Sequence, residues 1–276
     1  MRSQLLVFWD YDTQWGADRS RSPGGRKGWG GLEFSNTEEL LAVHETYEVP
    51  ACFAVVGAAA LNGCRPYHDP GQIRAIRAAG HEIASHSQYH EWLPALDRAR
   101  LVETLRTSKD TLEQCVGSEV LTFVPPFNQP FDYARRASIS ISERRQAGSA
   151  RTNLSGLCTA LAATGYRFCR VAYRPIWERV WGVVSRKAWN RPARLEAIAG
   201  IQCVRMNMGT GFDAEPRAFL AEHAGQGGLF IATGHPHSLH SGGPQDLEHL
   251  RRFLELVADL RSRNILEVSL PAALLA

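Results

Sequence analysis

The sequence predicts a single barrel of seven to eight parallel strands with crossover helices, a (β/α)7-8 barrel, spanning residues 1–276 as one domain. Three observations lead to this prediction. Short apolar runs typical of buried strands alternate with amphipathic stretches typical of helices. No segment has a linker composition that would divide the chain. The residues that could act in catalysis or metal binding directly follow predicted strands, and active sites lie at this position in parallel barrels.

The predicted elements share simple boundary signals. Asp, Asn, Ser or Thr precede several helices, and Gly80, Gly117 and Gly165 end three of them. The predicted strands are residues 5–9, 51–56, 82–85, 120–124, 166–171, 201–206, 229–233 and 265–268. The predicted helices are residues 37–48, 70–79, 94–116, 153–164, 215–223 and 245–261.

Composition excludes several classes of protein. The 276 residues are 44% hydrophobic and 21% charged, as in an ordinary globular chain, and the net charge of +3 is too small to indicate nucleic acid or an anionic membrane as partner. No apolar run is long enough to span a bilayer, and the first residues lack the features of a signal peptide, so we expect a cytoplasmic protein. Its six cysteines include no C-x-x-C pair and are interpreted as buried hydrophobic residues. No feature of the sequence indicates an oligomeric state.

Two pairs of polar residues suggest a metal site. Asp10 and Asp12 follow the first strand and face the same way if that strand continues; two such carboxylates repel each other unless a cation is present. His86 and His90 follow the third strand, and four-residue spacing places both on one face of a helical turn, within reach of one ion. The alternative interpretations are aspartates of a loop turn and a pair of loop histidines at a helix start.

Two basic segments are candidates for substrate contacts. Residues 18–31 are rich in Arg, Gly and Ser, and Arg19, Arg21 and Arg26 could hold an anionic group, although a solvated loop is the simpler interpretation. Residues 172–194 form a basic, Trp-rich insertion. Its aromatic side chains suit either the floor of a substrate groove or the packing of a surface helix.

These motifs, in this order, resemble the NodB-like polysaccharide deacetylases, carbohydrate esterase family four. The acidic pair corresponds to the first motif of that family, and its Asp-x-Asp spacing is similar to one branch. His-Ser-Gln-Tyr-His at residues 86–90, preceded by Gly-His-Glu-Ile at residues 80–83, corresponds to the second motif. Ile-Ala-Thr-Gly-His-Pro at residues 231–236 corresponds to the last motif. The resemblance covers most of the chain and implies a distorted barrel of the NodB-homology type.

The resemblance also implies roles for individual residues. The metal ligands are Asp12, His86 and His90, and the ion is Zn²⁺, with Co²⁺ or Ni²⁺ as alternatives. Asp10 is the general base, and His235 is the general acid, with His237 as the competing candidate. The oxyanion is held by the metal and a backbone N–H near Pro126. The substrate-binding residues are Pro126, Phe127, Asn128, Trp15 and His237.

Two departures from the family pattern stand out. The third motif normally carries an Arg that orients the base, and this chain has Val124 at that position. Another Arg, or Asn128, is expected to take its place. The fourth motif, an aspartate with a tryptophan, has no clear counterpart, and Asp213 or a Trp of the insertion is a candidate.

The sequence thus predicts a metal-dependent N-deacetylase that acts on an N-acetylated sugar or a related small or carrier-linked N-acyl substrate and releases acetate. Two alternatives remain open. One is another metal-dependent C–N hydrolase acting on a non-sugar amide, ureide or formamide, because one barrel and one metal site can serve several substrates. The other is a non-catalytic binding protein that keeps the metal pocket.

Overall fold

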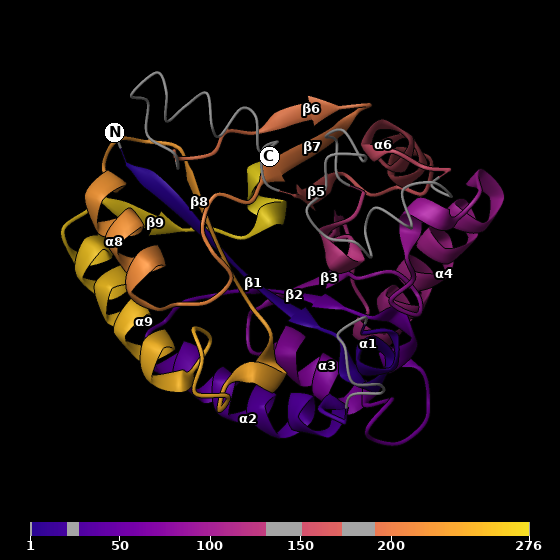
Figure 1. Cartoon of the computed structure of the whole chain (residues 1–276), viewed down its shortest axis with the longest axis horizontal. Coiled ribbons are helices and arrows are strands. Elements are labelled where there is room, and N and C mark those ends of the chain that lie inside the picture. The colour runs from indigo at the N-terminus through magenta and orange to yellow at the C-terminus, as the bar shows by residue number, and fades with distance from the viewer. Residues whose placement is uncertain (1, 21–27, 131–150, 173–190, 276) are drawn as a thin grey trace.

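The computed structural model describes residues 2–20, 28–130, 151–172 and 191–275, and the structural statements below concern these residues. Most of the predicted insertion at 172–194, and the arginines at 21 and 26, lie outside them. Strands and helices alternate as predicted, and the helices lie along the outer side of a curled sheet (Figure 1). No helix in the described part is long and apolar enough to cross a membrane.

The nine strands form one sheet in the order β6-β7-β5-β4-β3-β2-β1-β8, and β9 also pairs with β1. All neighbours are parallel except β6 and β7, which are antiparallel. The strands are β1 (Ser3–Tyr11), β2 (Cys52–Val55), β3 (Glu82–Ser85), β4 (Thr122–Phe123), β5 (Phe168–Val171), β6 (Glu196–Ile198), β7 (Ile201–Arg205), β8 (Leu229–Gly234) and β9 (Leu266–Val268).

Seven α-helices of the described residues cover the sheet, and several carry side-chain N-caps, such as Asp97 and Asp246. The helices are α1 (Thr13–Arg19), α2 (Gly30–Thr46), α3 (Pro70–Ala78), α4 (Arg98–Val116), α6 (Leu154–Ala163), α8 (Ala214–His223) and α9 (Leu247–Ser262). Short 3₁₀ turns are η1 (Gly57–Ala60), η2 (Leu93–Ala95), η3 (Pro126–Asn128), η5 (Pro236–Ser238) and η6 (Pro271–Leu275).

The sheet curls into a half-barrel, and contacts outside the main ladder bring its two ends together. Ala193 and Leu229 exchange backbone hydrogen bonds of 2.7 and 2.9 Å in an isolated antiparallel bridge. The Asn207 side chain donates to the carbonyl of Leu229 and accepts from the backbone N–H of Ile231. An amide side chain therefore replaces strand pairing on this side of β8, as expected for a distorted barrel.

Alternation along the strands separates two apolar clusters. The larger cluster lies between sheet and helices and includes Trp9, Phe53 and Phe230. The smaller one fills the inside of the curled sheet and includes Leu6 and Phe8, together with Leu274 and Leu275 of the C-terminal turn, which pack against it. Because side chains two apart share a face of a strand, the inward row that passes through Leu6 and Phe8 continues to Asp10.

The C-terminal turn is held by a buried carboxylate. Glu82, the first residue of β3, accepts hydrogen bonds from the Thr122 hydroxyl and from the backbone N–H of Ala272. The C-terminal turn therefore packs at the end of the strands opposite to their carboxyl ends.

Three predicted boundaries are wrong, each for a physical reason. The predicted helix 37–48 begins at Gly30, because tertiary packing of buried residues such as Phe34 overrides the poor helix propensity of the two leading glycines. The predicted helix 94–116 begins at Arg98, because Asp97 provides the N-cap. The predicted loop at 18–31 is partly helical, since α1 extends to Arg19. The antiparallel strand β6 was not predicted.

Candidate active site

The acidic pair lies where β1 ends. Asp10 belongs to the strand and points inward, whereas Asp12 lies just beyond it, at the N-cap of α1. Both are buried, at 7% and 6% exposure. Gly16 allows the chain to fold back tightly here, because a Cβ atom at that position would lie 2.5 Å from the Cβ of Asp12. The prediction that both carboxylates reach the carboxyl end of the barrel is in agreement with this geometry.

The histidine pair lies on a loop rather than on the helical turn that the spacing suggested. Ser87 and His90 adopt left-handed φ values of 63° and 57°, and these fold the loop after β3 so that both imidazoles point the same way. Glu91 supports this loop: its carboxylate accepts hydrogen bonds from the hydroxyls of Ser87 and Thr104 and from the backbone N–H of Tyr89. Sequence reasoning did not identify Glu91.

Asp12, His86 and His90 form one compact cluster. Each offers a ligand atom, and these atoms lie within 4.8 Å of one another. Asp12 Oδ1 lies 3.3 Å from His86 Nε2 and 3.4 Å from His90 Nε2. This buried oxygen forms no hydrogen bond of good geometry with any described residue. Three donor atoms thus converge on one point without satisfying one another, as expected of ligands arranged for a cation.

The tautomer of His86 also fits a metal ligand. Its Nδ1 lies 2.6 Å from the carbonyl oxygen of Val124, so Nδ1 carries the proton and Nε2 presents its lone pair toward Asp12. A backbone carbonyl that orients a ligating histidine in this way is a common second partner of metal sites. The residue that replaces the expected arginine therefore contributes through its main chain.

Arg170, on β5, contacts the carboxylate that the arginine missing at Val124 was expected to orient. Its Nη1 and Nη2 atoms lie 2.8 and 2.7 Å from the two carboxylate oxygens of Asp10, and Nη2 also donates to Asn128 Oδ1 at 3.3 Å. Arg170 is 1% exposed, and its guanidinium lies 5.2 Å from the ring centroid of Phe8, inside the sheet. Both replacements foreseen for the missing arginine, another Arg and Asn128, are thus present together around Asp10.

The charges in this cluster settle the ionisation of the carboxyls. Burial alone raises the pKa of Asp10, but the Arg170 guanidinium more than offsets it and lowers that pKa below its usual value. Burial likewise acts against ionisation of Asp12, and the neighbouring imidazoles of His90 and His86 hold its pKa well below the usual range. Both carboxylates are therefore ionised at neutral pH.

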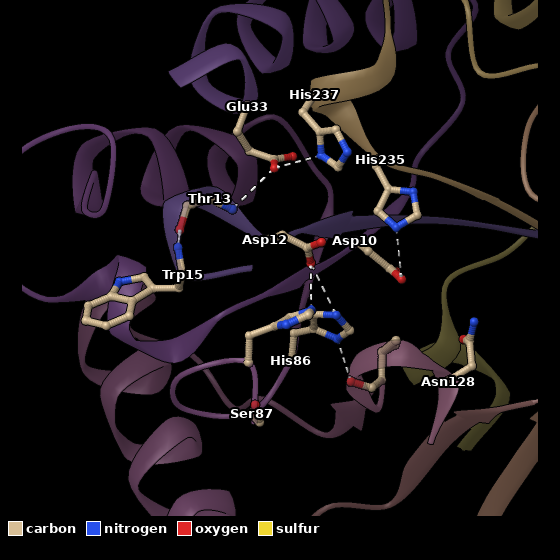
Figure 2. Close-up of polar contacts among 12 residues, drawn as sticks. Asp10, Asp12, Thr13, Trp15, Glu33, His86, Ser87, Asn128, His235 and His237 are labelled. Atoms are coloured by element: carbon tan, nitrogen blue, oxygen red, sulfur yellow. Dashed lines mark hydrogen bonds and ion pairs between the residues drawn. The ribbon is translucent and has the colours of Figure 1, made fainter. Parts of the chain in front are cut away.

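The two candidate acids follow β8 and have different partners. His235 Nε2 lies 4.0 Å from Asp10 Oδ2 (Figure 2). Its Nδ1 lies 3.1 Å from Gln245 Oε1. His237 Nδ1 lies 3.3 Å from Glu33 Oε2. The side chain that holds His235 is thus the amide of Gln245. Asp213, the candidate for the fourth motif, lies at the N-cap of α8.

Of the other predicted substrate-binding residues, Phe127 and Pro126 lie beside the cluster, and Trp15 does not. The Phe127 ring packs edge-on against His90 with centroids 4.5 Å apart, and Pro126 beside it is buried. Trp15 lies further out: its ring packs against Tyr67 and Tyr89, at 5.1 and 5.2 Å, and points away from Asp12 and Asp10 in Figure 2.

Part of the chain is similar to a known protein family and to one curated protein. Residues 28–141 match the model of the family described as polysaccharide deacetylase. The uncharacterized protein YlxY of Bacillus subtilis (strain 168) is 28% identical over 112 residues, which are 41% of this chain and 32% of the relative, so the matched region spans about a third of that protein.

Solved structures share the fold over nearly the whole chain. A putative polysaccharide deacetylase from Mycobacterium smegmatis superposes with a TM-score of 0.65 at 18% identity, covering 99% of this chain and 88% of that one. The structure titled Puue allantoinase superposes with a TM-score of 0.61 at 16% identity, with the same coverage. The match over residues 28–141 and the shared fold show that the chain is similar to the polysaccharide deacetylases and has the NodB-type barrel of these solved structures.

Proposed function

We propose that the protein is a metal-dependent N-deacetylase that hydrolyses the amide of an N-acetylated sugar, or of a related small or carrier-linked substrate, to acetate and a free amine. The observation that carries this proposal is the buried cluster of Asp12, His86 and His90 next to an Asp10 carboxylate held by Arg170 on both oxygens. The cluster supports binding of a cation, and the neighbouring carboxylate supports catalysis.

Asp12, His86 and His90 would hold the metal. One carboxylate and two imidazoles suit Zn²⁺ best, and Co²⁺ or Ni²⁺ accept the same donors. When bound, such a cation supplies Lewis-acid polarisation of the amide carbonyl and makes a water molecule more acidic. The rest of the proposal concerns the side chains around it.

Asp10 is proposed as the general base. The bidentate contact with Arg170 fixes the plane of its carboxylate and keeps it ionised, so that Oδ2 can accept a proton from the attacking water. Because its two oxygens are held by one rigid guanidinium, little reorganisation is needed during the reaction. A protein that only binds a metal has no use for this arrangement, which therefore favours an enzyme over a binding protein.

His235 is proposed as the general acid. Its Nδ1 is oriented by Gln245, which leaves Nε2 facing Asp10 Oδ2 across a gap of 4.0 Å. A leaving amine placed in this gap can take a proton from Nε2 as the C–N bond breaks, so that it departs neutral instead of as an amide anion. Phe127, with Pro126 and Asn128 beside it, and Trp15 further out, are proposed to contact the substrate, as is His237.

A second candidate is a different C–N hydrolase on the same barrel, acting on a non-sugar amide or ureide. The specific observation in its favour is that a structure titled an allantoinase superposes almost as well as one titled a putative polysaccharide deacetylase, with TM-scores of 0.61 and 0.65. Identities of 16% and 18% show a common fold and leave the substrate open.

Two measurements on the same preparations test the proposal. Elemental analysis is expected to find about one divalent metal per chain in the wild type, and none after His86→Ala; His240→Ala, at an exposed histidine, is the control that keeps the metal. Acetate release is then measured on a panel of N-acetylated sugars and nucleotide sugars, with allantoin and simple formamides alongside. Asp10→Asn is expected to keep the metal and lose turnover.

The outcomes separate the candidates. Metal binding together with acetate release establishes the deacetylase. Metal binding with hydrolysis of a ureide or formamide alone favours the second candidate. Metal binding without any hydrolysis, in a wild type that behaves like Asp10→Asn, favours the binding protein. Absence of metal after reconstitution with Zn²⁺, Co²⁺ and Ni²⁺ contradicts the assigned ligands.

A further inference from the structure

A buried carboxylate outside the proposed chemistry lies beside the site. Glu33, on α2, is 0% exposed. Its Oε2 accepts a hydrogen bond of 3.2 Å from the backbone N–H of Thr13 and lies 3.3 Å from His237 Nδ1. Its Oε1 is buried and has no hydrogen-bond partner among the residues that the structure describes. Burying a carboxylate in this way is costly, and His237, its one side-chain partner in the described part of the chain, offsets that cost.

His237 is held in a fixed orientation by two contacts. Its ring stacks on Trp29, with centroids 3.7 Å apart and planes 18° apart, and its Nδ1 faces Glu33. Burial works against the charged imidazole, but the hydrogen bond and negative charge of Glu33 raise the pKa of His237 above its ordinary value. In the protonated imidazole that Glu33 favours, Nδ1–H is committed to Glu33, and Nε2–H is the donor left for another molecule, since no described residue pairs with Nε2.

The position of this donor relates it to the proposed reaction. In Figure 2, His237 lies beside His235 and on the side of Asp12 away from His86. The His235 and His237 rings are 5.2 Å apart, and it is His235 that approaches Asp10. His237 therefore lines the wall next to the reacting groups without duplicating the general acid.

We propose that Glu33 and His237 form an anion-binding pair, in which His237 Nε2–H donates to a carboxylate of the substrate close to the scissile amide. This proposal rests on the proposed function and adds a substrate class to it: N-acyl compounds that carry an acidic group near the amide. Glu33 acts through His237 and is a positioning residue. A hydrogen bond between charged groups in such a site contributes about a 10- to 100-fold difference in affinity.

The test compares two ligands that differ in charge at one point. N-acetylmuramic acid has a carboxylate on the substituent of the ring carbon next to its acetamide, and its methyl ester lacks the charge. Affinity of both ligands for the metal-loaded protein is measured by calorimetry, and turnover by acetate release. We expect the wild type to bind the acid at least about 10-fold more tightly than the ester, with the difference appearing in KM rather than kcat.

Variants of Glu33 and His237 test whether this pair causes the preference for the acid over the ester. Glu33→Gln keeps the size of the side chain and an acceptor for Thr13, and His237→Asn keeps a donor but not the imidazole; both are expected to reduce the preference to about 2-fold or less, with kcat changed less than KM. The matched controls are Glu39→Gln and His240→Asn, which alter an exposed His–Glu pair of 2.8 Å and are expected to keep the full preference. Thermal unfolding of each variant identifies any that fails to fold.

The readouts distinguish this inference from the proposed function. Turnover of neutral N-acetyl sugars with equal affinity for acid and ester overturns the anion-binding pair and leaves the deacetylase intact. Tighter binding of the acid that disappears in Glu33→Gln supports the pair even if no sugar is hydrolysed. A preference unchanged in both variants also overturns it, and so does a large fall in kcat at constant KM, because that result would assign His237 to the chemical step.

Discussion

Arg170 on β5 binds both carboxylate oxygens of Asp10 on β1, at 2.8 and 2.7 Å, across the inside of the curled sheet. Three strands separate the two in the sheet order, and 160 residues separate them in the chain. The pair is buried, and Asn128 accepts a further hydrogen bond from the same guanidinium. An arginine from a different strand thus reaches the carboxylate that the third-motif arginine was expected to orient.

Two substitutions of Arg170 separate its effect on the orientation of the Asp10 carboxylate from the effect of its positive charge. Arg170→Lys keeps a positive charge but cannot reach both oxygens at once, so we expect kcat to fall by about 10-fold or more with little change in metal content. Arg170→Met removes the charge and leaves Asp10 buried and unpaired, which costs about 3–5 kcal/mol of unfolding free energy. Steady-state kinetics and urea denaturation measure the two effects.

Arg167→Lys is the matched control, because Arg167 precedes the same strand and is exposed. Arg167→Lys is expected to leave both kcat and the unfolding free energy unchanged. An unaltered kcat in Arg170→Lys would show that Asp10 needs no bidentate partner.

Gly16 is expected to be required for the position of Asp12. An added Cβ atom at residue 16 would lie 2.5 Å from the Cβ of Asp12, which is too close, so Asp12 must shift. Because metal sites are sensitive to small displacements of a ligand, Gly16→Ala should weaken Zn²⁺ binding by about 10-fold or more. Competition with a chelator of known affinity measures this change.

Gly31→Ala provides the comparison, since nothing lies within 4 Å of a Cβ atom at that helical position. Alanine there should leave Zn²⁺ affinity unchanged and raise helix stability slightly. Equal Zn²⁺ affinity in the two variants would mean that Asp12 is not a ligand or that the turn adjusts freely.

The residues of the site differ in how visible they are in the sequence. The spacing of Asp10, Asp12, His86 and His90 is local, so it identified the cluster that the structure brings together. Arg170 lies inside an apolar run, and its charge within a buried strand was the one available signal that it has a partner. Which partner it meets depends on how the sheet curls, and the local pattern of apolar residues carries no information on that.

The elements of the fold also differ in how well the local sequence predicts them. Eight strand predictions correspond to strands of the structure, because buried parallel strands give short apolar runs. The strand β6 was missed because its residues are half-buried or exposed, and α1 because it is a single short helix beyond a charged strand end. Glu33 could not be recognised, since it lies before the predicted helix 37–48, and a glutamate is ordinarily exposed to solvent.

Glu91 is expected to control the histidine loop. Its two oxygens accept three hydrogen bonds, from Ser87, Tyr89 and Thr104. Glu91→Gln replaces one acceptor oxygen by an NH₂ group, so at least one of these donors loses its partner. Because such supporting residues orient the ligands, we expect a fall of about 10- to 100-fold in Zn²⁺ affinity.

The control is Glu103→Gln, at an exposed position of α4 next to Thr104. Zn²⁺ affinity is measured by chelator competition in both variants. If Glu91→Gln binds Zn²⁺ like the wild type, the loop keeps its conformation without the carboxylate.

Two buried histidines predict how stability depends on pH. His44 Nδ1 lies 2.7 Å from the Val49 carbonyl oxygen, and its Nε2 accepts a hydrogen bond from Trp9 Nε1. His81 Nδ1 accepts from the backbone N–H of Ala51. Protonating either ring places an N–H against another N–H. Burial, reinforced by the charge of His81, lowers the pKa of His44 to about 3, and burial lowers that of His81 to about 4.

The sign of the effect follows from these values. Above pH 6.5 both histidines are neutral in the folded and the unfolded chain, so their full contribution to stability is present. Below pH 6.5 the unfolded chain binds protons that the folded chain cannot, and the unfolding free energy falls by about 1.4 kcal/mol per pH unit for each residue. The loss continues to about pH 4 for His81 and about pH 3 for His44, and amounts to roughly 2 kcal/mol each at pH 5.

Urea denaturation between pH 7 and pH 4.5 measures this slope. His44→Gln removes one of the two groups and is expected to reduce the slope by about 1.4 kcal/mol per pH unit. His240→Gln, at an exposed histidine, should leave the slope unchanged. Because both variants are compared with the wild type at each pH, titration of the other histidines and carboxylates cancels. Equal slopes in His44→Gln and the wild type would show that His44 takes up a proton in the folded protein.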